Sequence, residues 1–399
     1  MLHTSRKVTR EDSKIHNSNL VLRTIYTQGE ISRAGIARQT RLTAATVSTI
    51  VADLIERGLV EESGPVSSAR GKPPTLVHVA TDAFHLIGLD LARSEFQGAV
   101  TDLRGKILHQ ASAPIDGQIG EAALALVYQL IDRLLACAER PILGIGIGSS
   151  GIIDARRGLV LQAVNFGWYD LPLQKLLAER YGLPVHIAND NDMAALAEYS
   201  YGRYKNSSEL VTVNVGYGIG AGLIINHQIY HGHGFGAGEI GHVTVVEDGE
   251  QCRCGNRGCL ETVASSRAIT QRARLIAESG KGSLPGILAP SLDEINIQHV
   301  VQAYLAGDQT LQPLVDEAGR YLGIALANLV GVLSIEHILL SGSVAGFGPP
   351  LFKSIQQEIE RRSLARSVSK TRVEPATFEK DAVLLGTVAL LLSEELGVA

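Results

Sequence analysis

Three cysteines within eight residues constrain this chain more than any other feature of its sequence. Cys252, Cys254 and Cys259 follow His242 in the segment 238–261, which reads GEIGHVTVVEDGEQCRCGNRGCLE. One imidazole and three thiolates form a closed tetrahedral zinc shell. Such crowding in a reduced chain favours a metal ion over disulfides, or over free thiols clustered by chance. We therefore expect one Zn²⁺ per chain, held by these four residues.

The same segment indicates what the metal does. Gly255 and Gly258 let the backbone fold tightly enough for the three sulfurs to face one ion. A shell closed by four protein ligands leaves no position for a reactive water molecule. The expected zinc is therefore structural, and it stabilises the fold of its own loop.

Composition is that of a globular protein with several domains. The chain has 399 residues, of which 45% are hydrophobic and 19% are charged, which favours two or three domains. No apolar run reaches the roughly 18 residues that a membrane span requires. The first residues, MLHTSRKVTREDSK, carry no apolar signal core. We expect a cytoplasmic protein without a membrane partner.

Charge is distributed unevenly along the chain. Residues 1–80 contain 11 Lys and Arg against 7 Asp and Glu, a net charge of +4, and the remainder carries −9. A basic head on an acidic body suggests that only the head meets a polyanion. A charge of +4 over 80 residues is also unremarkable, so charge alone leaves both interpretations open.

The head shows helical periodicity from about residue 16 to residue 60, after an arm-like or disordered segment 1–15. Ser32 is an expected N-cap of a second helix, and Thr43 of a third. Apolar residues then recur with the spacing of one helix face, at Val47, Ile50, Val51 and Leu54. The Ser-, Gly- and Pro-rich segment 61–75 cannot be helical, and 76–79 reads as a strand.

This order predicts a winged helix-turn-helix that binds double-stranded operator DNA. The outer face of the third helix carries small polar and methyl groups that let its backbone approach the major groove. A cationic wing tip suits a narrow minor groove. A dimerisation or protein-interaction module is the alternative. The predicted DNA-binding residues are Ser32, Arg33, Thr43, Ala44, Ala45, Thr46, Ser48, Thr49, Arg70, Gly71 and Lys72.

Beyond residue 82 the sequence alternates between strands and helices. Strands are expected at 85–91, 142–148 and 209–216, of which the last two end in glycine, and helices are expected at 121–140, 171–181 and 192–204. This is the pattern of an α/β body large enough for two lobes.

The motif CxCGxxGCxE, together with segment 215–242, resembles the ROK family, named for repressors, open reading frames and kinases. The resemblance covers nearly the whole chain and is strongest to xylose- and N-acetylglucosamine-type repressors. It implies a winged helix (1–80) followed by a two-lobed, actin-like (RNase-H-type) α/β body. The first lobe would span 81–195, with a C-terminal helix (385–399) returning to it, and the second 196–384. It also implies a homodimer or homotetramer.

The resemblance further implies a monosaccharide pocket. Asn189 and Asp190 match the family's Asn-Asp, in which the aspartate is the catalytic base of the kinases. Glu239, His242 and Glu261 match residues that contact sugar hydroxyls. Zinc would orient the loop that carries these groups. Without the motif, Glu239 and Glu261 would read as surface carboxylates. Two further positions match less securely: Gly151 and Asn165.

The segments that bind ATP in ROK kinases are altered in this chain. ROK kinases end their first strand in Asp-x-Gly-Gly-Thr, whereas here Ala92, Arg93 and Ser94 follow Asp90. Cβ atoms therefore stand where backbone must approach phosphate. The second phosphate loop has Tyr217 in place of threonine, and 341–345 departs from the family's glycine-rich adenosine segment. We expect no catalytic residue, with Asp190 as a vestigial base.

We therefore expect a transcriptional repressor of carbohydrate-utilisation genes, released from its operator by a monosaccharide or a derivative. An ATP-dependent cytoplasmic sugar kinase with an accessory helical head is the alternative from another class. A scaffold that senses a phosphotransfer component is a third.

Overall fold

The computed structural model describes residues 9–63, 75–280, 291–362, 364 and 370–398. By their contacts the described residues form two compact units. The first unit runs as far as Ala188 and includes the C-terminal residues from Thr387, and the second is Asn189–Gly386. The domain bounds expected from the sequence stay a prediction. No helix in the described part of the chain is long and apolar enough to cross a membrane.

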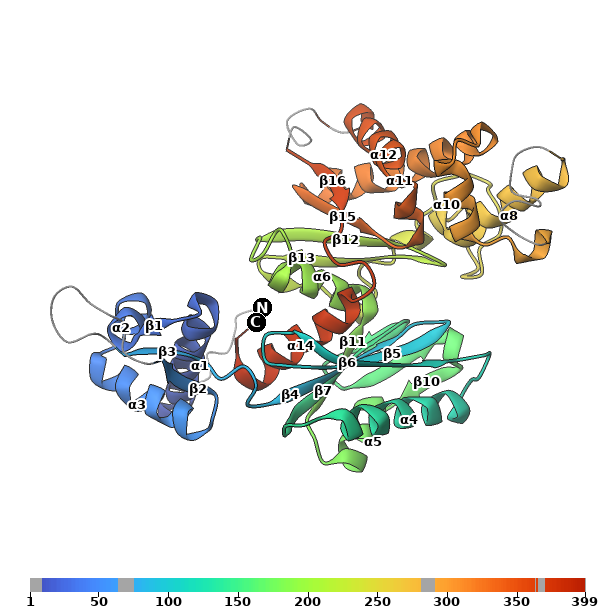
Figure 1. The fold of residues 1–399 in the computed structure, drawn as a ribbon. Helices are drawn as coiled ribbons and strands as arrows, with labels where there is room; N and C mark the ends of the chain where they lie inside the picture. The colour runs from blue at the N-terminus through green and yellow to red at the C-terminus, as the bar shows by residue number, and fades with distance from the viewer. Residues whose placement is uncertain (1–8, 64–74, 281–290, 363, 365–369, 399) are drawn as a thin grey trace. The chain divides into compact units, whose positions relative to one another are not determined.

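The N-terminal part of the first unit is a three-helix head with a small sheet (Figure 1). Its sheet has the order β1-β3-β2, with β3 antiparallel to both neighbours. The segment between β2 and β3 is outside the described residues, and with it the predicted wing residues Arg70, Gly71 and Lys72. The elements are α1 (Arg10–Gln28), β1 (Ile31–Ser32), α2 (Arg33–Thr40), α3 (Ala44–Glu56), β2 (Val60–Ser63) and β3 (Leu76–Val79).

Helix α1 begins earlier than its apolar stripe predicts. It starts at Arg10, so the expectation of an arm-like or disordered segment through residue 15 is wrong for its last six residues. Thr9 caps the helix by accepting from the Asp12 backbone N–H, and the Asp12 carboxylate accepts from the Thr9 N–H. Such a capping box stabilises a first turn that buries no apolar side chain.

The capping predictions for the next two helices are confirmed. Ser32 accepts a hydrogen bond from the Gly35 N–H, and Thr43 accepts one from the Thr46 N–H. Helix α3 buries its predicted apolar face against the other helices of the head. Each of its four buried residues contributes on the order of 1.5–3 kcal/mol of hydrophobic stabilisation. These residues are Val47, Ile50, Val51 and Leu54.

The body of the first unit is built on a five-stranded sheet of order β11-β7-β4-β5-β6, with β4 and β7 parallel. A second sheet of order β10-β9-β8 follows β7 in the chain. The elements are β4 (His85–Leu91), β5 (Glu95–Thr101), β6 (Ile107–Pro114), α4 (Glu121–Cys137), β7 (Ile142–Ser149), β8 (Ile152–Asp154), β9 (Leu159–Ala163), η1 (Val164–Phe166), β10 (Trp168–Leu171), α5 (Leu173–Tyr181) and β11 (Val185–Asn189).

Alternating side chains bury both faces of this sheet. Ile87 and Leu89 of β4 pack in the cluster that contains α4, whereas Leu86 belongs to the cluster that contains the C-terminal helix α14 (Ala382–Leu396). Backbone approach is close on the α14 side, because a Cβ on Gly146 would lie 2.6 Å from the Thr387 carbonyl oxygen. The predicted strand 85–91 is therefore confirmed as a strand buried on both sides.

The second unit has its own five-stranded sheet, of order β14-β13-β12-β15-β16. β12 runs antiparallel to β13 and parallel to β15, which is parallel to β16. The elements up to the cysteine motif are α6 (Asp190–Tyr201), β12 (Glu209–Val215), β13 (Ile219–Ile225), β14 (Gln228–Ile229), η2 (His233–Phe235) and η3 (Ile240–His242). The later elements are α7 (Leu260–Ala264), α8 (Ser266–Glu278), η4 (Leu292–Glu294), α10 (Ile297–Leu305), η5 (Gln309–Leu311), α11 (Gln312–Leu333), β15 (His337–Ser341), η6 (Ser343–Phe347), α12 (Pro349–Arg362) and β16 (Arg372–Pro375).

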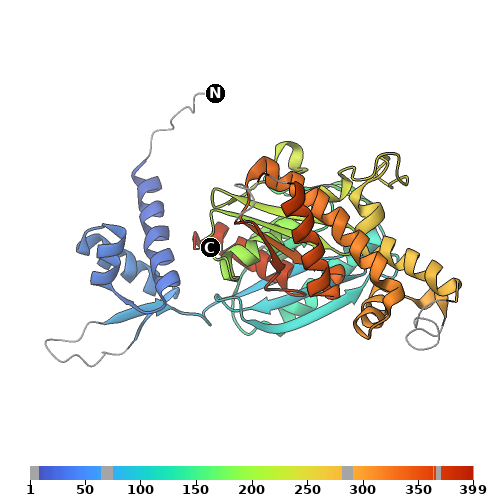
Figure 2. The ribbon, with the colours of Figure 1, turned by 90° about the horizontal axis from the view of Figure 1, so that it is seen from above.

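Helices cover both faces of this second sheet. Leu210 of β12 packs with Ala195 of α6, whereas Val211 and Val213 face the cluster formed with α11 and α12. The orange α11 and the red α12 lie side by side in both views (Figures 1 and 2). Their approach is close because a Cβ on Gly319 would meet Ser354 at 2.5 Å.

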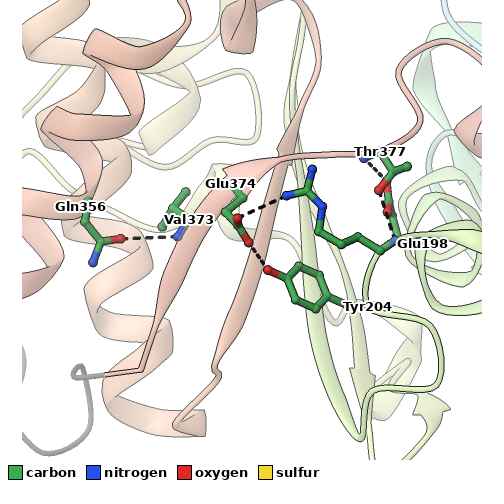
Figure 3. A network of polar contacts seen from close by, with 7 residues as sticks. Glu198, Tyr204, Gln356, Val373, Glu374 and Thr377 are labelled. Atoms are coloured by element: carbon green, nitrogen blue, oxygen red, sulfur yellow. Dashed lines mark hydrogen bonds and ion pairs between the residues drawn. The ribbon is translucent and has the colours of Figure 1, made fainter.

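A polar network anchors the C-terminal end of α6 to the chain beyond β16 (Figure 3). The buried carboxylate of Glu198 accepts from the backbone N–H groups of Thr377 and Phe378, at 2.5 and 3.0 Å. Glu374 of β16 accepts from the Tyr204 hydroxyl and from Arg203. Because buried carboxylates are costly unless hydrogen-bonded, this network fixes α6, whose first residue is Asp190.

Candidate functional site

The four predicted zinc ligands converge on one point. The ligand atoms of His242, Cys252, Cys254 and Cys259 all lie within 4.8 Å of one another. Cys254 Sγ and Cys259 Sγ are 3.7 Å apart, as are Cys252 Sγ and His242 Nδ1. With metal–sulfur bonds of about 2.3 Å, a tetrahedral shell holds its sulfurs about 3.8 Å apart. The cluster can therefore hold a metal ion, and its donor set fits zinc.

The backbone around the cysteines needs its two glycines, as the sequence predicts. Gly255 has φ +97° and Gly258 has φ +66°. A Cβ on Gly258 would lie 1.7 Å from the Val246 carbonyl oxygen, whereas nothing lies within 4 Å of one on Gly255. Gly258 therefore serves close backbone packing, and Gly255 serves only the turn.

His242 connects this cluster to the predicted sugar ligands. Its Nδ1 faces Cys252, and its Nε2 lies 3.8 Å from Glu239 Oε2. A carboxylate near the second ring nitrogen of a ligating histidine orients the ring and raises its basicity. The pKa of Glu239 lies above its usual value, chiefly because partial burial disfavours the charged form. The nearby His242 opposes this rise, and the charge of Glu261 adds to it.

Strand β13 fixes the position of the Glu239–His242 turn through glycines. The Ala221 N–H donates to the Gly238 carbonyl at 2.8 Å. Gly238 has φ +89°, and a Cβ there would lie 1.9 Å from the Ala221 oxygen. A Cβ on Gly241 would lie 2.2 Å from the Ile219 oxygen. Any larger residue at 238 or 241 would move the carboxylate and the imidazole away from the sheet.

Asn189 and Asp190 form the start of α6. The Asn189 Oδ1 accepts from the N–H groups of Asn191 and Asp192 and so caps the helix. Any hydrogen bond from Asn189 to a sugar would come from its amide nitrogen, because the oxygen is occupied. Asp190 Oδ1 accepts from the backbone and side-chain nitrogens of Asn191, at 2.9 and 3.0 Å.

The electrostatic environment of Asp190 is unusual for an aspartate. Burial raises its pKa to about 6, the Asn191 N–H opposes the shift, and the charges of Glu239 and Asp192 add to it. A carboxyl group with a pKa near neutrality can accept or release a proton at physiological pH. It can equally serve as a hydrogen-bond acceptor for a sugar hydroxyl.

Glu261 is nearly enclosed in the first turn of α7, with 9% of its surface exposed. Arg267 Nη2 lies 4.0 Å from its Oε1. A Cβ on Gly218, in the β12–β13 turn, would lie 2.9 Å from its Oε2. Glu261 is therefore a buried carboxylate with the Arg267 guanidinium beside it, rather than a surface acid.

Gly151 and Asn165 lie in the other unit. Gly151 has φ +110°, and a Cβ there would lie 2.2 Å from the Gln162 carbonyl oxygen. Only glycine fits this backbone conformation and this close approach, so Gly151 has a structural role whether or not it binds a ligand. Asn165 is exposed in η1. Neither is placed relative to the carboxylates of the second unit.

The residues that depart from the family's nucleotide-binding pattern lie in two turns and along one pocket. Arg93 and Ser94 are exposed in the β4–β5 turn. Tyr217 occupies the β12–β13 turn, with the Arg253 guanidinium 5.3 Å from its ring centre. The segment that starts at Ser341 lines a pocket of about 730 Å³ that also includes Phe352 and Lys380.

The predicted recognition surface lies on the solvent side of α3. Ala44, Ala45, Ser48 and Thr49 are exposed, as is Thr43 before the helix, while Thr46 is half-buried. The Thr43 and Thr46 hydroxyls lie 2.8 Å apart, and the Thr49 hydroxyl donates to the Ala45 carbonyl. Arg33 forms an ion pair of 2.7 Å with Glu62. Arg33 would have to leave this partner to reach DNA.

Two arginines beside α3 were missed as DNA-binding candidates. Arg38, near the end of α2, and Arg41, in the turn before α3, are exposed. Arg41 has φ +58° in the left-handed region, which directs the chain into the recognition helix. Their positive charge could have identified them from the sequence, because cations that flank a recognition helix contact phosphates.

Comparison with known proteins matches both parts of the chain. The ROK family model matches residues 86–394, and a MarR family model matches residues 20–71. The chain is 33% identical to the xylose repressor of Caldicellulosiruptor bescii over 384 residues, covering 95% of this chain and 96% of the relative.

Kinases and regulators both occur among the relatives. The glucokinase of Halalkalibacterium halodurans is 34% identical over 317 residues, covering 77% of this chain and 95% of the enzyme. A crystal structure described as a ROK family transcriptional regulator, homologous to the Escherichia coli MLC protein, matches with a TM-score of 0.86 and 28% identity. That match covers 97% of this chain and 98% of the other. The winged-helix head, the α/β body and these matches together establish that this chain belongs to the ROK family.

Proposed function

We propose that this protein is a sugar-responsive transcriptional repressor that a monosaccharide or a derivative releases from operator DNA. The observation that carries the proposal is the union, in one chain, of a MarR-type winged helix and a ROK body. The match to the xylose repressor covers 95% of this chain, whereas the match to the glucokinase covers only 77% of it.

The head has the surface that DNA binding requires. The exposed face of α3 is made of alanine, serine and threonine side chains, which allow close approach to a major groove. Arg38 and Arg41 would contact the phosphates on either side. We propose Arg38 and Arg41 as additions to the predicted contact set.

The second unit has groups suited to a sugar. Asp190, Glu239 and Glu261 offer carboxylate oxygens, and Asn189 offers an amide nitrogen, which together match a ring of hydroxyl groups. His242 would link this set to a structural Zn²⁺, since its other ring nitrogen faces the cysteines. The metal would hold the loop rigid, so that Glu239 and Glu261 keep their positions.

We propose that the protein is not a sugar kinase. Phosphoryl transfer depends on backbone amides that approach the phosphates closely. The β4–β5 turn contains Ala92, Arg93 and Ser94, and the β12–β13 turn carries the Tyr217 ring. The retained Asp190 would then act as an acceptor for a sugar hydroxyl. ATP consumption in the presence of a panel of hexoses should stay at the level without sugar.

Operator binding tests the proposal directly. Bound sequences would be selected from a random duplex library, and fluorescence anisotropy would then follow the affinity of the selected duplex as monosaccharides are added. We expect one sugar to weaken DNA binding, by an amount limited by its differential affinity for the two states. Tighter binding with sugar would contradict release, and the absence of any selected sequence would contradict the repressor function.

A variant pair separates the two activities. Glu261→Gln should reduce the response to sugar and leave the affinity for the operator without sugar unchanged. Arg38→Gln should weaken operator binding and leave sugar affinity unchanged. Loss of both activities in either variant would indicate a folding defect rather than a site. Sedimentation of the full chain would show whether it is the dimer or tetramer that paired half-sites require.

A further inference from the structure

A hydrogen bond joins the two segments of the second unit that carry Asp190 and Glu239. His231 Nδ1 lies 2.8 Å from Asp192 Oδ2. A carboxylate can only accept, so the imidazole nitrogen donates. Asp192 is in the first turn of α6, two residues after Asp190, and His231 follows β14 in the segment that leads to Glu239. The pair therefore links the start of α6 to the chain just before Glu239.

This pair is largely shielded from solvent. The Asp192 side chain has 9% of its surface exposed, and that of His231 has 26%. Burial raises the pKa of Asp192, and the hydrogen bond and the charge of His231 oppose the rise. Because a buried carboxylate is costly without a donor, the imidazole is held in place beside the helix. Exposed ion pairs, by contrast, contribute little.

The backbone connects the position of His231 to that of Glu239. The Ala237 N–H donates to the His231 carbonyl at 3.2 Å, which closes segment 231–237 into a loop. The next residue, Gly238, accepts from the Ala221 N–H of β13 at 2.8 Å, and Glu239 follows it. A displacement of His231 would therefore move the end of the loop from which the Glu239 carboxylate projects.

The loop has little rigidity of its own. Three of its seven residues are glycines, at positions 232, 234 and 236. Gly232 and Gly234 have φ values of +68° and +73°. Nothing lies within 4 Å of a Cβ on Gly234 or Gly236, so no close packing confines these two positions. Glycine-rich backbone loses much conformational freedom when it is ordered, and the His231–Asp192 contact restricts that freedom before a ligand arrives.

We propose that His231 and Asp192 are a positioning pair of the sugar site, which holds the carboxylate of Glu239 at a fixed place relative to α6. The inference rests on the proposed function, because Asp190 and Glu239 act together only if a sugar bonds to both. Such a sugar binds more tightly when the separation of the two carboxylates is set in advance, because less conformational freedom is lost on binding. The pair acts through Glu239, so neither of its side chains needs to touch the sugar.

Variants of the full chain separate positioning from a general effect on folding. His231→Ala removes the donor. His231→Asn keeps it, because the asparagine amide nitrogen reaches the position of Nδ1, whereas the amide nitrogen of His231→Gln reaches that of Nε2. His186→Ala is the matched control, because His186 lies 2.7 Å from Glu395 with similar exposure but belongs to the other unit.

Two measurements apply to each variant. Amide hydrogen exchange of segment 231–239 without sugar reports the order of the loop. Isothermal titration with D-xylose, D-glucose and N-acetyl-D-glucosamine reports sugar affinity. His231→Ala and His231→Gln should speed exchange in this segment but not in the rest of the unit, and should weaken the best-binding sugar about 10-fold. His231→Asn should return sugar affinity to within about threefold of the native value, and His186→Ala should change neither measurement.

A double-mutant cycle tests whether Glu239 is the group that is positioned. In a chain that already carries Glu239→Ala, His231→Ala should weaken sugar binding by less than about threefold, since no carboxylate remains to be held. Equal weakening in both backgrounds, no rescue by His231→Asn, or unchanged hydrogen exchange in His231→Ala would overturn the proposal. If none of the three sugars binds the native chain, the failure lies with the proposed function, and hydrogen exchange alone supports or overturns the positioning.

Discussion

Asp190→Asn is predicted to stabilise the protein while it weakens sugar binding. A pKa of about 6 in place of 3.8 means that the folded chain binds this proton more tightly than the unfolded chain. Between pH 3.8 and pH 6 the folded state therefore holds more protons, and stability falls as pH rises through that window. Above pH 6 the full cost of the buried charge is present. The neutral amide avoids this cost, and its oxygen can still accept from Asn191.

The size of the effect follows from the pKa. A rise from 3.8 to about 6 is worth about 3 kcal/mol, at about 1.4 kcal/mol for each tenfold change in proton affinity. The side chain is only half-buried, so solvent screening reduces the expected gain to about 1–2 kcal/mol at pH 8. Loss of the charged acceptor should weaken sugar binding about 10-fold.

Chemical denaturation of the full chain at a series of pH values measures this effect. The stability difference between Asp190→Asn and the native chain should be largest at pH 8, shrink as the pH falls below about 6, and be smallest at pH 4, near the ordinary pKa of 3.8. Asp53→Asn, at an exposed position of α3, is the control for exchanging a carboxylate for an amide, and should change stability by less than about 0.5 kcal/mol. A variant less stable than the native chain at pH 8, or a difference that is the same at pH 4, would refute the reasoning.

Three further predictions concern the loop that carries the three clustered cysteines, the hydrogen bonds of Glu198 in α6, and the DNA-binding head. Gly258→Ala should destabilise the protein and reduce its zinc content as measured by mass spectrometry. Gly255→Ala should cost only about 1–2 kcal/mol for its backbone conformation, and equal costs would contradict the packing described. Glu198→Ala leaves two partly buried N–H groups without acceptors and should cost about 1–3 kcal/mol in calorimetry, against almost nothing for the exposed Glu179→Ala. Arg38→Gln should lower the dependence of DNA affinity on salt by about one counterion, a change that Lys175→Gln on α5 should not produce.

Local patterns in the sequence were sufficient for the caps and the buried strands. Ser32 and Thr43 were identifiable because a cap bonds only three residues away, and strand 85–91 because its apolar residues are continuous. Helix ends were less accurate: α4 stops at Cys137 rather than at residue 140, and Pro141, which disfavours helical backbone before it, was the available signal. The start of α1 was missed because its first turn is polar.

Partners distant in sequence were not predictable. The Arg33–Glu62 pair spans 29 residues and the bonds of Glu198 span about 180, so no periodicity reports them. The cluster of one histidine and three cysteines that could hold a metal ion was predictable, because three of its four residues lie within eight residues of the chain. The roles of Asn189 as a helix cap and of Gly151 as a close-packing glycine required coordinates, because one residue type serves structure and binding alike.

The separation of a buried face from an exposed face on α3 has a consequence for the evolution of such a protein. Its four buried residues hold the head together, and its outward side chains contribute almost nothing to that packing. Outward substitutions can therefore accumulate at little thermodynamic cost. A duplicated copy of this chain could acquire a new set of target genes through a few such changes. Its folding, its metal loop and its response to small molecules would be inherited intact.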